Sequence, residues 1–262
     1  MKQLLMLLLG LYMFTSCTQS RNSEQSKTNE TNETDDFRTD GSGQNAAFDS
    51  WEEEAERNIR LRPKYGKVIK TKEQIEADEA FIRETLQQRQ FAGDRTKASN
   101  QMVKTGFDYL YKGDLKTAMY RFNQAYLLDS LNSDIYWGFG GIYMTLQKYE
   151  EAKMQYLEGL SISPNNTHLL TDLGTYYSLQ CQLLQPTDEI QALISLDSAI
   201  INLKKSYAID SQDPNTTFKL STCYLVRSDC DNAWRYYEEC VALGGQPIPD
   251  GYAEYIKSKC GK

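Results

Sequence analysis

The sequence predicts an all-α protein, a solenoid of helical hairpins with one additional helix before the array and a capping helix after it. First, the frame of AMYRFNQAYLLDS, residues 118–130, returns as AKMQYLEGLSISP and AIINLKKSYAIDS, residues 152–164 and 199–211. Second, small and aromatic residues recur with a 34-residue period. A unit of this length cannot bury its apolar face alone, so neighbouring units have to stack.

Residues 1–16 have the organisation of a secretory signal peptide. Their apolar run, Leu4 to Phe14, is shorter than the roughly 20 apolar residues of a membrane-spanning helix. The following FTSC resembles the lipobox of bacterial lipoproteins, although Phe14 replaces the usual Leu. The resemblance implies that Cys17 is acylated and becomes the mature N-terminus. The alternative is a plain signal peptide with an incidental cysteine, which leaves an exported but soluble protein.

Residues 17–50 are rich in Asn, Thr, Ser, Asp and Glu and contain almost nothing apolar. Such a segment cannot bury enough surface to offset its ordering entropy, so we predict a disordered tether that starts at the lipidated Cys17. The whole chain carries a net charge of −7 and has no basic stripe. This charge distribution argues against a nucleic-acid partner.

Residues 51–98 are predicted to form an N-terminal helical segment. Thr71 and Gln74 stand in capping-box positions, and Phe81 and Leu86 lie on one face of the helix that would follow. This helix, expected over residues 72–92, either packs on the first repeat or is half of a degenerate repeat. Residues 51–70 are charged, lack a clear periodicity and remain unplaced.

Four repeat units are expected, over residues 99–132, 133–166, 167–212 and 213–246. The first two follow each other without a gap. In the third, Ala199 arrives 13 residues later than the frame requires, which indicates an insertion. The fourth opens with Asp213 as N-cap and Pro214 at the first helical position, where a missing N–H costs nothing.

This pattern resembles that of the tetratricopeptide repeat family, over more than half of the chain. The resemblance implies two antiparallel helices per unit, with small side chains where the helices cross and bulky ones filling the gaps. The residues at these packing positions are Gly106, Tyr109, Ala118, Phe122, Gly140, Tyr143, Ala152, Tyr156, Gly174, Tyr177, Ala199, Tyr224, Ala233 and Tyr237.

The insertion in the third unit contains LQCQLLQPTDEIQALISLD. Pro186 is expected to end one helix, and Thr187 or Asp188 to cap the next. The insertion then either lengthens two helices and raises a hairpin tip, within which Cys181, Leu183, Leu184, Ile190 and Leu193 could pack, or it forms a protruding contact for a partner.

Residues 247–262 are predicted to form a helix that caps the last unit. Apart from Cys17, five cysteines remain in a compartment that permits disulfides. Cys230 starts the last unit's second helix and Cys260 ends the antiparallel capping helix, so we expect these two to be bonded. Cys240 falls on a small core position and is expected to be a buried thiol. The states of Cys181 and Cys223 stay open.

In this family the first helix of each unit lines a concave groove. The resemblance therefore implies a partner-binding groove formed by Val103, Phe107, Tyr111, Trp137, Met144, His168, Phe218 and Thr222. Its mixture of aromatic and polar side chains suits a peptide or a helix. Alternatively, the helix at residues 72–92 or the inserted tip occupies the groove. A carboxylate-clamp function is disfavoured because Val103 and Phe107 replace the Lys and Asn of clamp-type members.

Catalysis is not expected. His168 is the only histidine, and the chain lacks the GxSxG, HExxH and Walker motifs. No cofactor and no metal site are expected. The many Asp and Glu residues are interpreted as solvated helix faces.

The sequence thus predicts a non-catalytic, membrane-anchored scaffold in the periplasm that holds a protein or peptide partner. The expected location is the outer membrane, through acylated Cys17 in the bilayer. The same general organisation is found in lipoproteins of outer-membrane barrel assembly, pilus-secretin assembly and peptidoglycan-enzyme regulation. One alternative is a carbohydrate- or nutrient-binding accessory lipoprotein similar to the SusD-like family, whose members are far longer. A cytoplasmic co-chaperone is a third possibility if residues 1–17 are not a signal.

Overall fold

The structure is a computed structural model that describes residues 51–261. The expected signal peptide, Cys17 and the tether lie outside the described residues. The chain divides into two units, the first ending at Asn58 and the second running from Ile59 to Lys262. In the first unit, residues 51–57 are helical. All helices from residue 59 onward belong to the second unit.

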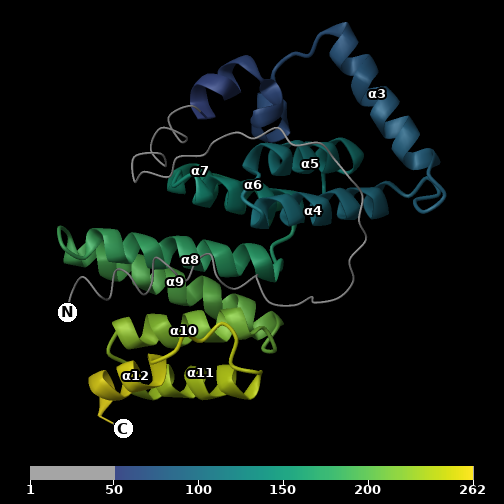
Figure 1. Cartoon of the computed structure of the whole chain (residues 1–262). Helices are drawn as coiled ribbons and strands as arrows, with labels where there is room; N and C mark the ends of the chain where they lie inside the picture. The colour runs from purple at the N-terminus through teal and green to yellow at the C-terminus, as the bar shows by residue number, and fades with distance from the viewer. Residues whose placement is uncertain (1–50, 262) are drawn as a thin grey trace, which may run out of the picture. The chain divides into compact units, whose positions relative to one another are not determined.

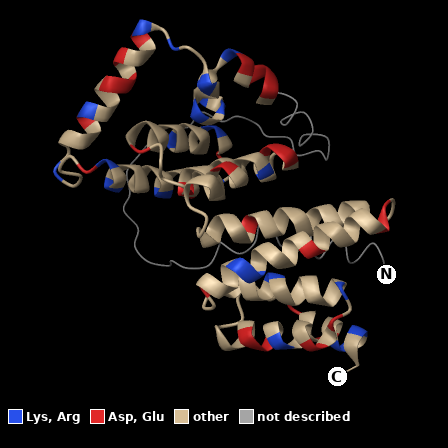
Figure 2. Cartoon of the chain, turned by 180° about the vertical axis from the view of Figure 1, so that it is seen from behind, with Lys and Arg blue, Asp and Glu red and all other residues tan. Residues whose placement is uncertain are grey.

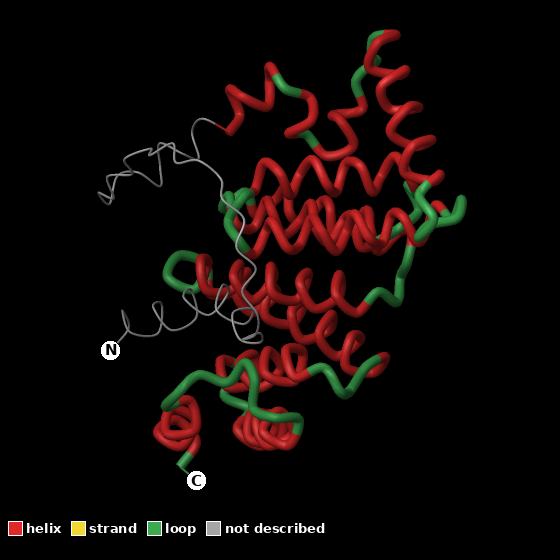
Figure 3. The backbone as a smooth tube through the Cα atoms, turned by 45° about the vertical axis from the view of Figure 1, so that its right-hand side comes forward, coloured by secondary structure: helices red, strands yellow, loops and turns green. Residues whose placement is uncertain are grey.

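The second unit is entirely helical (Figure 1), and the described residues contain no strand (Figure 3). Two 3-10 helices and a separate α-helix precede the array, and one short helix follows it. The order is η1 (Ile59–Leu61), η2 (Pro63–Lys67), α3 (Lys72–Gln87), α4 (Arg95–Tyr111), α5 (Leu115–Leu128), α6 (Asp134–Thr145), α7 (Tyr149–Ile162), α8 (Thr167–Leu184), α9 (Glu189–Ile209), α10 (Pro214–Val226), α11 (Cys230–Ala242) and α12 (Tyr252–Cys260).

Helices α4 to α11 form four antiparallel hairpins (Figure 1). Each helix packs most closely on the other helix of its hairpin and less closely on the next hairpin. This arrangement confirms the predicted all-α solenoid with a tetratricopeptide-type fold. Three hairpins lie within the expected units at residues 133–166, 167–212 and 213–246, whereas α4 begins at Arg95, before the first expected unit at residues 99–132. The turns between the paired helices are short, and Asp114, Asp188 and Asp229 cap the second helices by accepting from a backbone N–H.

Small residues allow the two helices of a hairpin to touch. A Cβ added to Gly106 would lie 2.6 Å from Cε1 of Phe122, and one added to Gly174 would lie 2.7 Å from Cγ of Leu203. Gly140 stands in the same relation to the ring of Tyr156. Because Phe122 and Tyr156 are buried, the bulky side chain fills the space that the missing Cβ leaves.

Two asparagines link consecutive hairpins at equivalent places. The side-chain amide of Asn132 donates to Ser99 Oγ at 3.0 Å and to Asn100 Oδ1 at 2.8 Å. One unit later, Asn166 donates to Ser133 Oγ at 2.9 Å and to Asp134 Oδ1 at 2.7 Å. The repeat period therefore governs polar contacts between units as well as apolar packing within them.

Residues 59–67, which belong to the stretch that the sequence left unplaced, pack on the first repeat. Leu61 of η1 is fully buried, and both 3-10 helices pack on α5. The buried amide of Asn123 in α5 donates to the backbone carbonyls of Arg60 at 2.8 Å and Arg62 at 3.0 Å. Lys64, which is 8% exposed, forms an ion pair with Glu158 of α7. These contacts attach the segment to two hairpins at once.

Helix α3 begins at Thr71, whose side chain forms the expected capping box with Gln74. Phe81 and Leu86 pack against the cluster formed by Phe91, Ala98 and Leu128. The helix therefore packs on the first repeat, and it ends at Gln87, earlier than the expected residue 92.

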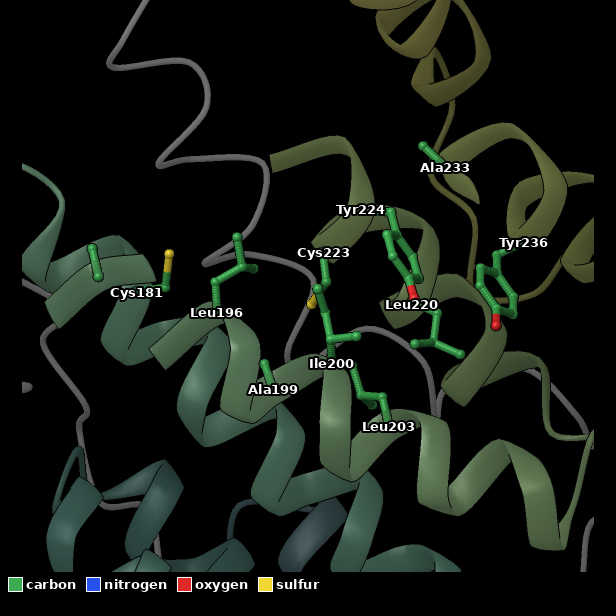
Figure 4. Close-up of a cluster of buried hydrophobic side chains, with 11 residues drawn as sticks. Cys181, Leu196, Ala199, Ile200, Leu203, Leu220, Cys223, Tyr224, Ala233 and Tyr236 are labelled. Carbon is green, nitrogen blue, oxygen red and sulfur yellow. The ribbon is translucent and has the colours of Figure 1, made fainter. Parts of the chain in front are cut away.

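The insertion lengthens both helices of the third hairpin. Helices α8 and α9 contain 18 and 21 residues, against 12 and 14 in α6 and α7. Cys181, Ala192 and Leu196 extend the hydrophobic core into the added turns (Figure 4). The expectation that Leu183, Ile190 and Leu193 pack within the tip is wrong, because their side chains are 53%, 72% and 53% exposed.

Helix α12 covers the end of the array. Tyr252 and Ile256 form a cluster with Phe218 of α10 and Cys240 of α11. Cys230 and Cys260 are joined by a disulfide, with their Cα atoms 5.5 Å apart. The bond connects the start of α11 to the end of α12 and so holds the end of the capping helix against α11. Cys181, Cys223 and Cys240 are free and buried.

Candidate partner-binding groove

Aromatic side chains from the first helices of three hairpins form a continuous row. The ring centroids of Phe107 in α4 and Trp137 in α6 are 4.0 Å apart. Trp137 in turn stacks on His168 of α8, with centroids 4.1 Å apart and planes 12° from parallel. Tyr111 continues the row on α4, 5.8 Å from Phe107. We call Tyr111, Phe107, Trp137 and His168 the aromatic row.

The row runs obliquely across the repeat frame and does not follow equivalent positions. Phe107 lies about one turn before the end of α4, whereas Trp137 and His168 lie in or near the first turn of α6 and α8. Gly141 lies one turn after Trp137, and a Cβ there would meet only Leu110 at 3.1 Å. The glycine keeps the surface low beside the indole ring.

A carboxylate lies against the row and was not identified from the sequence. The Nε1 of Trp137 donates a hydrogen bond of 2.8 Å to Oδ2 of Asp172 in α8. Burial raises the pKa of Asp172, and the nearby positive charge of Lys219 in α10 opposes this shift. Asp172 therefore connects α6, α8 and α10 electrostatically. Asp172 lies one helical turn after groove residue His168 on α8, and this spacing was the available signal.

A second carboxylate holds the histidine. Nδ1 of His168 lies 3.8 Å from Oδ1 of Asp134. The interaction with Asp134 raises the pKa of His168, and the interaction with His168 lowers the pKa of Asp134. The amide of Asn166 also donates to Asp134 at 2.7 Å and fixes the carboxylate. The aromatic row thus ends at an imidazole that favours its protonated form.

The predicted groove residues differ in how accessible they are. Tyr111 is 51% exposed and His168 is also exposed, whereas Val103 and Phe107 are 7% and 8% exposed. Trp137, Met144 and Thr222 are partly buried. Val103 and Phe107 therefore form the floor of the groove, and Tyr111, Trp137 and His168 offer the surface that a partner can reach.

Phe218 does not belong to this surface. It is 9% exposed, and its ring lies 5.0 Å from that of Tyr252 in an edge-to-face contact. The capping helix covers the position that the repeat frame assigns to the groove. Sequence reasoning assigned Phe218 to the groove because the frame describes a unit inside an array, where no cap intervenes.

The helix before the array packs elsewhere. The described contacts of α3 are with α4 and α5, at Ala98, Met102 and Leu128. Trp137 and His168 belong to α6 and α8. The exposed imidazole and the exposed Tyr111 ring are therefore not covered by this helix.

Between residues 51 and 261, no group of three or more His, Cys, Asp and Glu residues could hold a metal ion. Burial raises the pKa of the Cys223 and Cys240 thiols to about 11, so neither is a ready nucleophile. Within the same residues, no helix combines the length and apolar character needed to cross a bilayer.

No family model and no curated protein matches the chain. Among solved structures, it is similar to PilF of Pseudomonas aeruginosa, with 19% identity over 72% of this chain and 90% of that one and a TM-score of 0.46. It is also similar to PilW, a widely conserved type IV pilus biogenesis factor, with 17% identity over 62% of this chain and 86% of that one and a TM-score of 0.35. The TPR2AB domain of yeast Sti1, in complex with pHSP90, is similar with 14% identity over 83% of this chain and 91% of that one and a TM-score of 0.35.

Proposed function

We propose that this chain is a non-catalytic scaffold that binds a segment of a partner protein along the aromatic row. The observation that carries the proposal is the continuous contact of the Phe107, Trp137 and His168 rings across three hairpins, with Tyr111 exposed beside it. Aromatic rings that are held by a rigid scaffold offer contact area at a small cost in conformational entropy. Such a surface suits an apolar side chain on an extended or helical segment.

Two carboxylates add a preference to this surface. Asp172 accepts from Trp137 and lies beside His168, and Asp134 holds the other side of the imidazole. A partner segment that places a basic residue next to its apolar anchor would meet both acids. The positive charge of Lys219, on the next hairpin, already balances part of the negative charge of Asp172.

The groove is tested by site-specific photocrosslinking in intact cells. A photoreactive residue replaces Tyr111, which is 51% exposed, or Met154 of α7, which is 57% exposed and lies outside the row. We expect one discrete crosslinked partner from position 111 and not from position 154. His168→Glu should lower that crosslink at least several-fold, whereas Met154→Glu should leave it unchanged. Equal capture from both positions, or capture insensitive to His168→Glu, would contradict the proposal.

We further propose that the scaffold is exported and anchored through acyl chains on Cys17. The anchor lies in the outer membrane, and the scaffold faces the periplasm. The support is the FTSC motif after a short apolar run and the polar stretch that follows it. Several buried acyl chains, at about 0.8 kcal/mol per CH₂, would give stable attachment. Metabolic labelling with palmitate tests this step, with Cys17→Ala as the control. Label that persists in Cys17→Ala would sink the anchor proposal without affecting the groove.

A further inference from the structure

The outer face of α9 carries an apolar stripe that no described residue covers. Ile190, Leu193, Ile194 and Ile201 are 72%, 53%, 51% and 60% exposed. Their spacing places them on one side of the helix. The opposite side is buried, through Ala192, Leu196 and Leu203. A helix that is apolar on both sides is normally covered on both sides, so the stripe requires an occupant.

Charged residues border the stripe asymmetrically. Glu189 precedes it at the start of α9, and Lys204 and Lys205 follow it about one turn before the end. All three are exposed and form no ion pair within residues 51–261. Figure 2 shows that the α8 and α9 pair is otherwise largely uncharged, in contrast to α3. The stripe is therefore acidic at one end and basic at the other.

We propose that a second copy of this chain covers the stripe, with the two α9 helices antiparallel across a two-fold axis close to Asp197. In this register Glu189 of one copy faces Lys204 of the other, and the same pair recurs on the far side of the axis. Ile194 of one copy then lies against Ile201 of the other. A two-fold interface has to be self-complementary, and a face with opposite charges at its two ends meets that condition.

The residue at the axis is compatible with this pairing. Two Asp197 carboxylates would repel each other if both were free. In the structure Asp197 forms an ion pair with Arg227 of the same chain, which supplies a compensating charge at the axis. A lipid surface is the competing occupant of an apolar stripe. An antiparallel second copy is favoured over it because that copy pairs Glu189 with Lys204, whereas an anionic lipid surface would leave Glu189 beside like charges.

The pairing leaves the aromatic row accessible, because the row belongs to α4, α6 and α8. A dimer would present two grooves on one particle. Two binding sites held together raise the apparent affinity for a partner that is itself repeated or clustered, without any new contact. The inference does not depend on the groove, since the two surfaces use different helices.

The test is disulfide trapping of the full chain in cells. Asp197→Cys places a thiol at the proposed axis, and Gln191→Cys places one at an exposed site of α9 about 100° around the helix. We expect most of the Asp197→Cys protein to migrate as a disulfide-linked dimer on a non-reducing gel. Gln191→Cys and the unaltered chain, whose thiols in the described region are buried, should remain monomeric.

Charge reversal tests the register in the Asp197→Cys background. Glu189→Lys and Lys204→Glu should each lower the dimer fraction several-fold, and the double variant should restore it. Equal trapping from positions 191 and 197, or a double variant that behaves like the singles, overturns the proposal. A lipid surface is indicated instead if Asp197→Cys stays monomeric while Ile194→Glu reduces co-sedimentation with phosphatidylethanolamine and phosphatidylglycerol vesicles.

Discussion

The indole Nε1 of Trp137 donates a hydrogen bond of 2.8 Å to Oδ2 of Asp172 and so links the second hairpin to the third. The same indole ring stacks on His168 and packs at a tilt against Phe107. Trp137 therefore combines apolar contact along the row with a polar contact beneath it. The arrangement fixes the ring plane that a partner would meet.

Trp137→Phe removes this donor and keeps an aromatic ring in the row. The carboxylate of Asp172 then loses its indole partner, which should lower the free energy of unfolding by about 1–3 kcal/mol. The pKa of Asp172, which burial already raises, should rise further. Urea unfolding of the two proteins at neutral pH measures the difference. The double variant Trp137→Phe/Asp172→Asn should recover part of the loss, and an unchanged midpoint for Trp137→Phe would contradict the assignment.

Two adjacent glycines of α6 should respond to alanine with opposite signs. A Cβ at Gly140 runs into the buried ring of Tyr156, so Gly140→Ala should destabilise the fold by about 1–3 kcal/mol through overpacking. A Cβ at Gly141 meets only Leu110 at 3.1 Å, near the end of a flexible side chain. Gly141→Ala should therefore gain up to about 1 kcal/mol from helix propensity. Thermal and urea unfolding of both variants provide the comparison.

The only histidine provides a direct readout of the groove, because its ring protons give one set of NMR signals. Asp134 raises the pKa of His168 above the usual 6.5. Stability from this shift is complete below pH 6.5 and is lost as the pH rises through the folded pKa. The lowered pKa of Asp134 contributes stability above its usual 3.8, which is lost as the pH falls through the folded value.

The pair therefore stabilises the fold most between the usual pKa of the acid and that of the histidine. Asp134→Asn should lower the pKa of His168 towards 6.5 and remove the loss of stability that the pair causes as the pH rises above 6.5 or falls below 3.8. A histidine pKa that does not move in Asp134→Asn would show that the 3.8 Å contact has no electrostatic effect. Asp188→Asn, at a distant helix cap, serves as the control.

Removal of the disulfide should release the capping helix. The bond closes a loop between residues 30 positions apart, which corresponds to about 3.6 kcal/mol in the chain-entropy model. Cys230→Ser/Cys260→Ser should lower the free energy of unfolding by roughly that amount. Trypsin should also cut the variant faster after Lys257 and Lys259 of α12. Cleavage at an unchanged rate would mean that Tyr252 and Ile256 hold the cap without the bond.

The sequence determined the fold class and the packing inside each hairpin. The small residue and the bulky residue that fills its space lie within one unit. They are 16 positions apart for Gly106 with Phe122 and for Gly140 with Tyr156, and 29 apart for Gly174 with Leu203, where the insertion of 13 residues intervenes. Local and periodic constraints of this kind are legible in one sequence, because every copy states the same packing rule again. The neighbourhood of Cys230 and Cys260 followed from the same logic, since two antiparallel helices of known length bring their ends together.

Only the tertiary structure decided which surfaces remain free. The path of residues 59–67 over α5 depends on the buried amide of Asn123 and on backbone carbonyls, which leave no periodic trace. Phe218 lies under α12 and Ile190 faces outward, although the pattern suggested the reverse for both. Asp172 became a groove residue through a contact between hairpins. Such contacts join residues that are far apart in the chain, so they leave no local or periodic pattern that can be recognised in a single sequence.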